Sequence, residues 1–119
     1  MSAQTLSAGV VITLGDDEYE LKANLKAATA ISNRFGGFSN ALAAVAGSDL
    51  AAITFVVRQG VPMRDVSSKD LEEAVWLAGT RHLMGDVMSY VTRLANGGRD
   101  PDLEADETKQ SDEGAEGNG

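Results

Sequence analysis

The 119-residue chain contains no cysteine, one histidine and two prolines, and aromatic residues make up only 5% of it. The lack of cysteine excludes a disulfide framework and any thiolate metal site. The scarcity of aromatic residues means that a core must be built from Ala, Leu, Val and Met, within a hydrophobic content of 43%. A chain of this length and composition fits one domain.

Long apolar runs are also missing. No stretch approaches the length that spans a membrane, and the opening MSAQTLSAGVVITL lacks the basic region of a signal peptide. We therefore expect a cytoplasmic protein with no membrane partner.

The net charge of −8 is concentrated at the C-terminal end. Residues 1–99 contain ten acidic and nine basic side chains, whereas residues 100–119 contain eight acidic side chains and one lysine. A nearly neutral body predicts no nucleic-acid partner, because phosphate binding needs a basic face. Residues 100–119 have too little apolar surface to offset the entropy of ordering, so we expect a disordered tail. That tail either solubilises the chain or occupies a basic partner.

Residues 10–99 are predicted to form a single domain after a flexible segment, residues 1–9. Alternating apolar residues in GVVITLGDDEYELKAN, with a Gly-Asp-Asp turn between them, indicate a β-hairpin with one buried face. A hairpin alone is marginally stable in water and must pack on the helices that follow.

The stretch SNRFGGFSNAL raises the question of a phosphate-binding glycine loop. It matches neither GxxxxGK[ST] nor GxGxxG after a strand. A corner between helices accounts for it instead. Asn24 can cap a first helix that Gly36 ends in a left-handed conformation, and Ser39 can cap a short second helix.

Two further helices are predicted after residue 47. Ser48 or Asp49 can cap the third, which ends at Gly60. Ser67 begins the fourth, a long helix over residues 68–96. The predicted fold is therefore α+β but mainly α, with an N-terminal β-hairpin packed on about four helices and a disordered acidic C-terminal tail.

The apolar stripe of the long helix changes face near Gly79. At roughly 100° per residue, one side carries Leu71, Ala74, Val75 and Ala78, and the other carries Trp76, Leu77, Leu83, Met84, Val87, Met88, Val91 and Leu94. Either the helix bends at Gly79 or its first half is apolar on both sides. One small domain cannot easily cover both sides, so part of this surface is expected to face a partner. Because methionine adapts to varied partners, the candidates are Trp76, Met84, Met88 and Val91, although core filling explains the methionines equally well.

Catalytic and metal-binding patterns are weak. His82 and Asp86 are one helical turn apart, but with no second histidine they make half a metal site. The GDDE stretch lacks the spaced ligands of a calcium loop, and no nucleophile motif is present. The sequence predicts no enzyme activity, no cofactor and no metal.

The stretch ITLGDDEYELKANLKAATAISNRFGGFSNALAAV resembles the start of small proteins encoded among the tail genes of phages and gene transfer agents. Their hairpin pattern I-x-L-x-x-x-x-Y-x-L, Ala-rich helix, aromatic-Gly corner and Leu/Ala helix correspond here to Ile12, Leu14, Tyr19, Leu21, Phe35, Gly36 and Leu42. The resemblance covers residues 10–60 and points to the tail-assembly chaperone group, which includes gene-transfer-agent proteins described as tail-tube related. It implies a protein that keeps the tape-measure protein soluble, in the cytoplasm of a bacterial host or associated with the virion, and it carries no catalytic residues.

Three functions are therefore considered. The first is a tail-assembly chaperone that binds the tape-measure or another tail protein. The second is a structural, tube-related tail component that forms homo-oligomers through the edge of its hairpin. The third is a small adaptor domain unrelated to phages.

Overall fold

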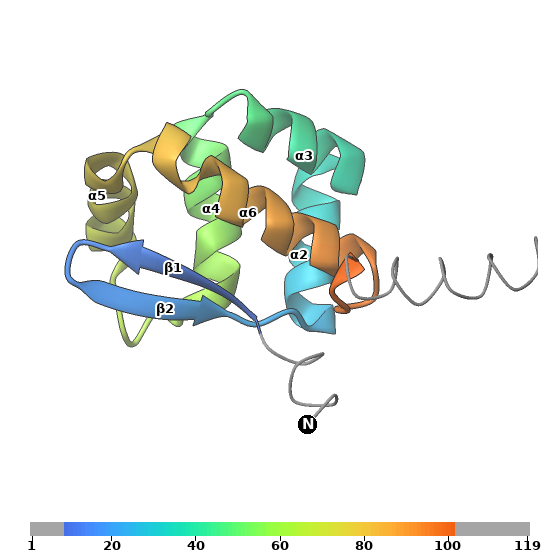
Figure 1. Cartoon of the computed structure of the whole chain (residues 1–119), viewed down its shortest axis with the longest axis horizontal. Coiled ribbons are helices and arrows are strands. Elements are labelled where there is room, and N and C mark those ends of the chain that lie inside the picture. The colour runs from blue at the N-terminus through green and yellow to red at the C-terminus, as the bar shows by residue number, and fades with distance from the viewer. Residues whose placement is uncertain (1–8, 102–119) are drawn as a thin grey trace, which may run out of the picture.

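A computed structural model describes residues 9–101 of the chain (Figure 1). Its elements are β1 (Val10–Leu14), β2 (Asp17–Leu21), α2 (Leu25–Phe35), α3 (Phe38–Ala46), α4 (Leu50–Gly60), α5 (Ser68–Ala78) and α6 (Thr80–Ala95). The predicted class, a hairpin packed on helices, is confirmed. The predicted flexible N-terminus and disordered tail lie outside the described residues, apart from Gly9, Asp100 and Pro101.

The two strands form the antiparallel hairpin that the alternation predicted. Ile12 lies opposite Tyr19, and Leu14 lies opposite Asp17 across the two-residue turn. The inward face of β1 is buried, whereas Val11 on its outer face is 52% exposed. The hairpin therefore behaves as one wall of the core, packed against α4, α5 and α6.

Helix α6 occupies the centre of the molecule. It passes in front of α4 and α2 in Figure 1, and it packs against α2, α3, α4, α5 and β1. Its buried residues are Leu83, Val87, Tyr90, Val91 and Leu94. They join apolar side chains of every other element in one core, which includes Ile12, Leu21, Ile31, Ile53 and Leu71.

Three helices begin at side-chain caps, as predicted. The Oδ1 atom of Asn24 accepts a hydrogen bond from the Ala27 amide at 2.9 Å. Asp49, rather than Ser48, caps α4 through the Ala52 amide at 3.0 Å. The Ser67 hydroxyl accepts from the Asp70 amide at 3.3 Å. Each cap satisfies an amide that the first turn of a helix leaves without a backbone partner.

The FGGF stretch is a corner between α2 and α3, as predicted, but it is capped differently. Gly36 adopts the left-handed conformation, with φ 74° and ψ 35°. Ser39 is not the N-cap, because α3 already begins at Phe38 with Gly37 before it and no side-chain cap. Asn40 reaches back instead, and its Nδ2 atom donates to the carbonyls of Phe35 at 3.0 Å and Gly36 at 3.3 Å. The start of α3 is therefore held by hydrogen bonds to the C-terminal end of α2.

The single long helix predicted over residues 68–96 is wrong, since the chain breaks it at Gly79. Gly79 has φ 99° and ψ 119°, a backbone conformation that favours glycine. Its N–H still closes α5 on the Val75 carbonyl, and its carbonyl accepts from the Leu83 amide to begin α6. The break lets each half turn its own apolar stripe inward, so residues 9–101 contain the five helices α2 to α6. Of the two explanations for the change of apolar face at Gly79, the structure therefore supports a bend in the chain.

Candidate functional site

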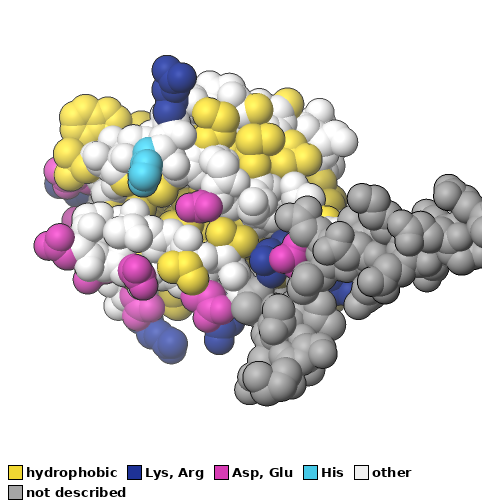
Figure 2. Space-filling model, viewed as in Figure 1, with side chains coloured by type: hydrophobic (Ala, Val, Ile, Leu, Met, Phe, Trp, Pro, Cys, Tyr) yellow, Lys and Arg dark blue, Asp and Glu magenta, His cyan; other side chains and the backbone are white. Residues whose placement is uncertain are grey.

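The outer face of α5 carries the most prominent exposed apolar pair of this helix. Leu71 and Val75 turn into the core, and this rotation leaves Trp76 64% exposed and Leu77 69% exposed. Figure 2 shows hydrophobic side chains gathered over α5 on this face. Trp76 is the only tryptophan of the chain. The sequence predicted that Trp76 faces a partner, and in the structure its side chain is exposed and accessible to one. Leu77 belongs to the same surface but was not among the predicted site residues.

Met84 and Met88 lie one turn apart on α6 and are half-buried against the core. Helix α3 packs along the same helix and contributes Phe38 and Leu42, which are also partly buried. A second group of hydrophobic side chains lies over α3 and α6 in Figure 2. Each methionine therefore fills part of the core and still presents an edge to solvent.

Val91 requires a correction. It was predicted to face a partner together with the methionines, but its side chain is fully buried, with 0% exposure. Because α6 begins anew at Gly79, its stripe is directed into the centre of the fold. Val91 has no surface to offer in this conformation.

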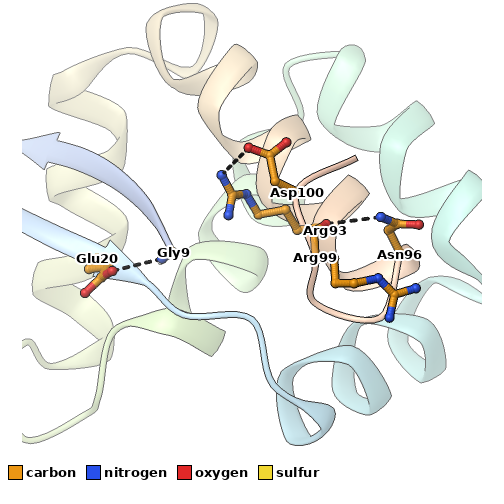
Figure 3. Close-up of polar contacts among 6 residues, drawn as sticks. All are labelled: Gly9, Glu20, Arg93, Asn96, Arg99 and Asp100. Carbon is orange, nitrogen blue, oxygen red and sulfur yellow. Dashed lines mark hydrogen bonds and ion pairs between the residues drawn. The ribbon is translucent and has the colours of Figure 1, made fainter. Parts of the chain in front are cut away.

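Gly85 opens a shallow hollow beside Met88. A Cβ atom added at Gly85 would have no neighbour within 4 Å, although the residue lies inside α6. The hollow has a volume of about 370 Å³ and is lined also by Ser89, Thr92 and Pro101. The ion pair between Arg93 and Asp100, 3.2 Å from Nη2 to Oδ2, forms part of its wall (Figure 3). Asp100 therefore takes part in the folded body, whereas the sequence assigned it to the tail.

We define the α5–α6 surface as two groups, the exposed pair Trp76 and Leu77 on α5 and the set Met84, Gly85 and Met88 on α6. It combines large exposed apolar side chains, adaptable methionines and a position without a side chain. Such a composition suits contact with an apolar helix, because aromatic and methionine side chains supply contact area and glycine permits close approach. It offers no nucleophile and no acid–base pair.

The residues considered for chemistry are dispersed. His82 and Asp86 are both exposed on α6. Within residues 9–101, no three His, Cys, Asp or Glu side chains come together as a metal site would require. In the same residues, no helix combines the length and the apolar character needed to cross a membrane.

Comparison of the chain with protein-family models, with curated proteins and with solved structures finds no match. The resemblance to tail-assembly chaperones therefore stays a hypothesis that depends on the sequence pattern of residues 10–60.

Proposed function

We propose that this chain is a non-enzymatic, phage-type tail-assembly protein that acts as a chaperone for the tape-measure protein in the cytoplasm of a bacterial host. The observation that carries this proposal is the exposure of Trp76 and Leu77 side by side on α5. Leu71 and Val75 are the buried residues of the same helix, whereas Trp76 and Leu77 contribute little to the core. Together with the resemblance of residues 10–60, this surface supports a role in holding an apolar client.

Simple energetics favour the α5–α6 surface as the contact. Removing one leucine side chain from water contributes about 2 kcal/mol, and buried tryptophans are frequent among the residues that dominate binding energy. A tape-measure protein is long, helical and prone to aggregation. An apolar helix of such a client would lie against α5 and α6 as amphipathic helices lie in hydrophobic grooves.

The test is co-expression with a tape-measure protein of a phage or gene-transfer-agent tail. Trp76→Gln with Leu77→Gln should reduce capture of the client by at least ~10-fold, equivalent to about 1.4 kcal/mol. The matched control is Leu25→Gln with Val11→Thr, because these residues are also exposed, at 80% and 52%, but lie on α2 and β1. Equal capture by the α5 variant and the wild type, with both folded by circular dichroism, would rule out this surface.

Gly85 provides a second test at a single position. Gly85→Ala leaves the hollow largely open and should preserve capture, whereas Gly85→Arg should block it by filling the space beside Met88. Both substitutions replace a glycine that has free space around its Cα, so both variants should fold. Trp76 also reports binding directly, since its fluorescence should shift to shorter wavelength when the client covers it.

A structural tail component is the second candidate, and the hairpin favours it. The described sheet has two strands only, so each strand has one neighbour and one outer edge. Outer edges of this kind can pair with strands of another copy. Size-exclusion chromatography with light scattering separates the two functions. A ring-sized or tube-sized assembly of the purified chain alone would favour the structural role, and a small species that shifts only with the client would favour the chaperone.

A further inference from the structure

A basic cleft lies at the junction of β2, α2 and α4, away from the α5–α6 surface. Its volume is about 610 Å³. Four basic side chains line it, namely Lys22, Lys26, Arg58 and Arg64, and among residues 9–101 Glu20 is the one acidic residue of its lining. Four of the nine basic residues of the body therefore meet in one cleft.

Existing contacts compensate little of this positive charge, since among the described residues the four cations form one ion pair, between Arg64 Nε and Asp65 Oδ1 at 3.7 Å. The Glu20 carboxylate accepts a hydrogen bond from the Gly9 amide at 2.8 Å (Figure 3), and so is directed along the hairpin. Arg58 donates to the carbonyls of Val61 at 2.9 Å and Val66 at 2.7 Å. Those acceptors are neutral, so Arg58 is held in place without losing its charge. Lys22 and Lys26 are exposed.

The chain approaches this cleft again after α6. Gly98 lies close to Ala23, since a Cβ at Gly98 would be 3.5 Å from the Ala23 carbonyl oxygen. Asn24, the next residue, lines the basic cleft and also a smaller hollow formed with Gly97 and Gly98. Figure 1 shows the end of α6 beside the start of α2. The chain then turns back, because Pro101 lies with Gly85, Met88 and Ser89 of α6, so residues 102–119 start on the α6 side of the body and must pass around it to reach the cleft.

We propose that the acidic segment 102–119 docks in the basic cleft of its own chain. The segment has seven acidic residues and one lysine, against four cations and one carboxylate in the cleft lining. Its 18 residues span up to roughly 60 Å when extended, more than a domain of this size requires. The covalent link gives the segment a local concentration on the order of millimolar, so even a weak electrostatic contact is populated. The cleft is thus a site for an acidic peptide, and an acidic partner would have to displace the segment to bind there. This inference does not depend on the chaperone function.

The absence of cysteine makes a direct test simple. Ser111→Cys places a single spin label near the middle of the segment in the full chain. The amide signals of Lys22, Lys26 and Arg64 should lose more intensity than those of Gly15 and Asp16 in the hairpin turn, where acidic residues cluster. Raising the salt to about 1 M, which shortens the screening length to ~3 Å, should abolish this selective loss.

Charge-reversal variants identify the site. Lys26→Glu with Arg64→Glu should remove the selective loss, because both side chains are exposed and line the cleft. Lys69→Glu with Arg81→Glu makes the same change of charge at exposed positions outside the cleft lining and should preserve the loss. Replacing the seven carboxylates of residues 102–119 with amides should also remove the selective loss of intensity, as Lys26→Glu with Arg64→Glu should.

Three outcomes would overturn the proposal. One is equal intensity loss at the cleft and at the hairpin turn. Another is an equal effect of the two charge-reversal pairs, which would indicate only a response to net charge. The third is a loss that appears only when spin-labelled and isotope-labelled chains are different molecules, which would place the contact between copies.

Discussion

The hydroxyl of Tyr90 donates a hydrogen bond to the backbone carbonyl of Lys22 at 2.9 Å, across 68 residues of sequence. Tyr90 is fully buried in α6, and Lys22 follows directly after β2. This bond joins the central helix to the segment that leads from the hairpin into α2. It also satisfies the one polar group that Tyr90 brings into the core, which is a requirement for burying a tyrosine.

Tyr90→Phe should lower the free energy of unfolding by about 1–2 kcal/mol, because the Lys22 carbonyl loses its side-chain partner while the aromatic packing is kept. Urea unfolding followed by circular dichroism measures this difference. Tyr19→Phe is the matched control, since within residues 9–101 no hydrogen bond of the Tyr19 hydroxyl is found. A stability loss of the same size in both variants would show that the Lys22 bond is not the cause.

The free energy of unfolding should also fall at high pH, because the Tyr90 hydroxyl ionises more easily in the unfolded chain. Burial raises the pKa of Tyr90 from 10.0 to about 12. The folded state therefore holds the phenol proton more tightly than the unfolded state. The resulting contribution of Tyr90 to the free energy of unfolding is complete below pH 10 and is lost as the pH rises through about 12. The loss is about 1.4 kcal/mol per pH unit in this window, or about 3 kcal/mol in all. Tyr90→Phe lacks it, so the wild type should lose its advantage over the variant in urea titrations between pH 10 and pH 12. A constant difference across this range would contradict the prediction.

Two helical glycines should respond oppositely to alanine. A Cβ at Gly60 would lie 2.8 Å from the Cα of Leu21, a backbone atom of β2 that cannot move aside, so Gly60→Ala should destabilise the fold by about 1–3 kcal/mol. Gly85 has free space, and Gly85→Ala should stabilise α6 by about 1 kcal/mol. Thermal unfolding of both variants is the measurement. Similar shifts in the same direction would mean that α4 does not pack so closely on β2.

Arg58 should hold the connection between α4 and α5. Arg58→Met removes its two hydrogen bonds to the carbonyls of Val61 and Val66 but keeps an apolar stem, and should cost about 3 kcal/mol. Amide exchange of Asp65 and Val66, which bond to the Pro62 carbonyl, should accelerate. Arg64→Met serves as the control, because Arg64 is exposed and pairs only loosely with Asp65, at 3.7 Å. Unchanged exchange in the Arg58 variant would exclude this anchoring role.

Features set by neighbouring residues could be predicted from the sequence. The hairpin follows from strict alternation around a short turn, and Ile12 and Leu21 were placed correctly on its buried side. The caps at Asn24 and Ser67 involve residues only three positions apart. In each case the interaction that decides the structure lies within one turn or one strand pair, so a short window of sequence contains it.

Features that depend on packing between distant elements could not be predicted. The periodicity of residues 68–96 allowed a bend at Gly79 or a helix apolar on both sides, and only the core decides between them. Once α6 fills the centre, Val91 is buried and Trp76 stays outside. The basic cleft has no local signal, because Lys22 and Lys26 lie far along the chain from Arg58 and Arg64.

The sequence by itself therefore determined the hairpin, most of the helix ends, the apolar core composition and the concentration of acidic residues after residue 100. The tertiary structure decided which apolar residues face solvent and which charges lie together. The physical reason is that burial is shared among elements. A helix can satisfy its hydrogen bonds alone, but which of its faces is covered depends on every element that packs against it.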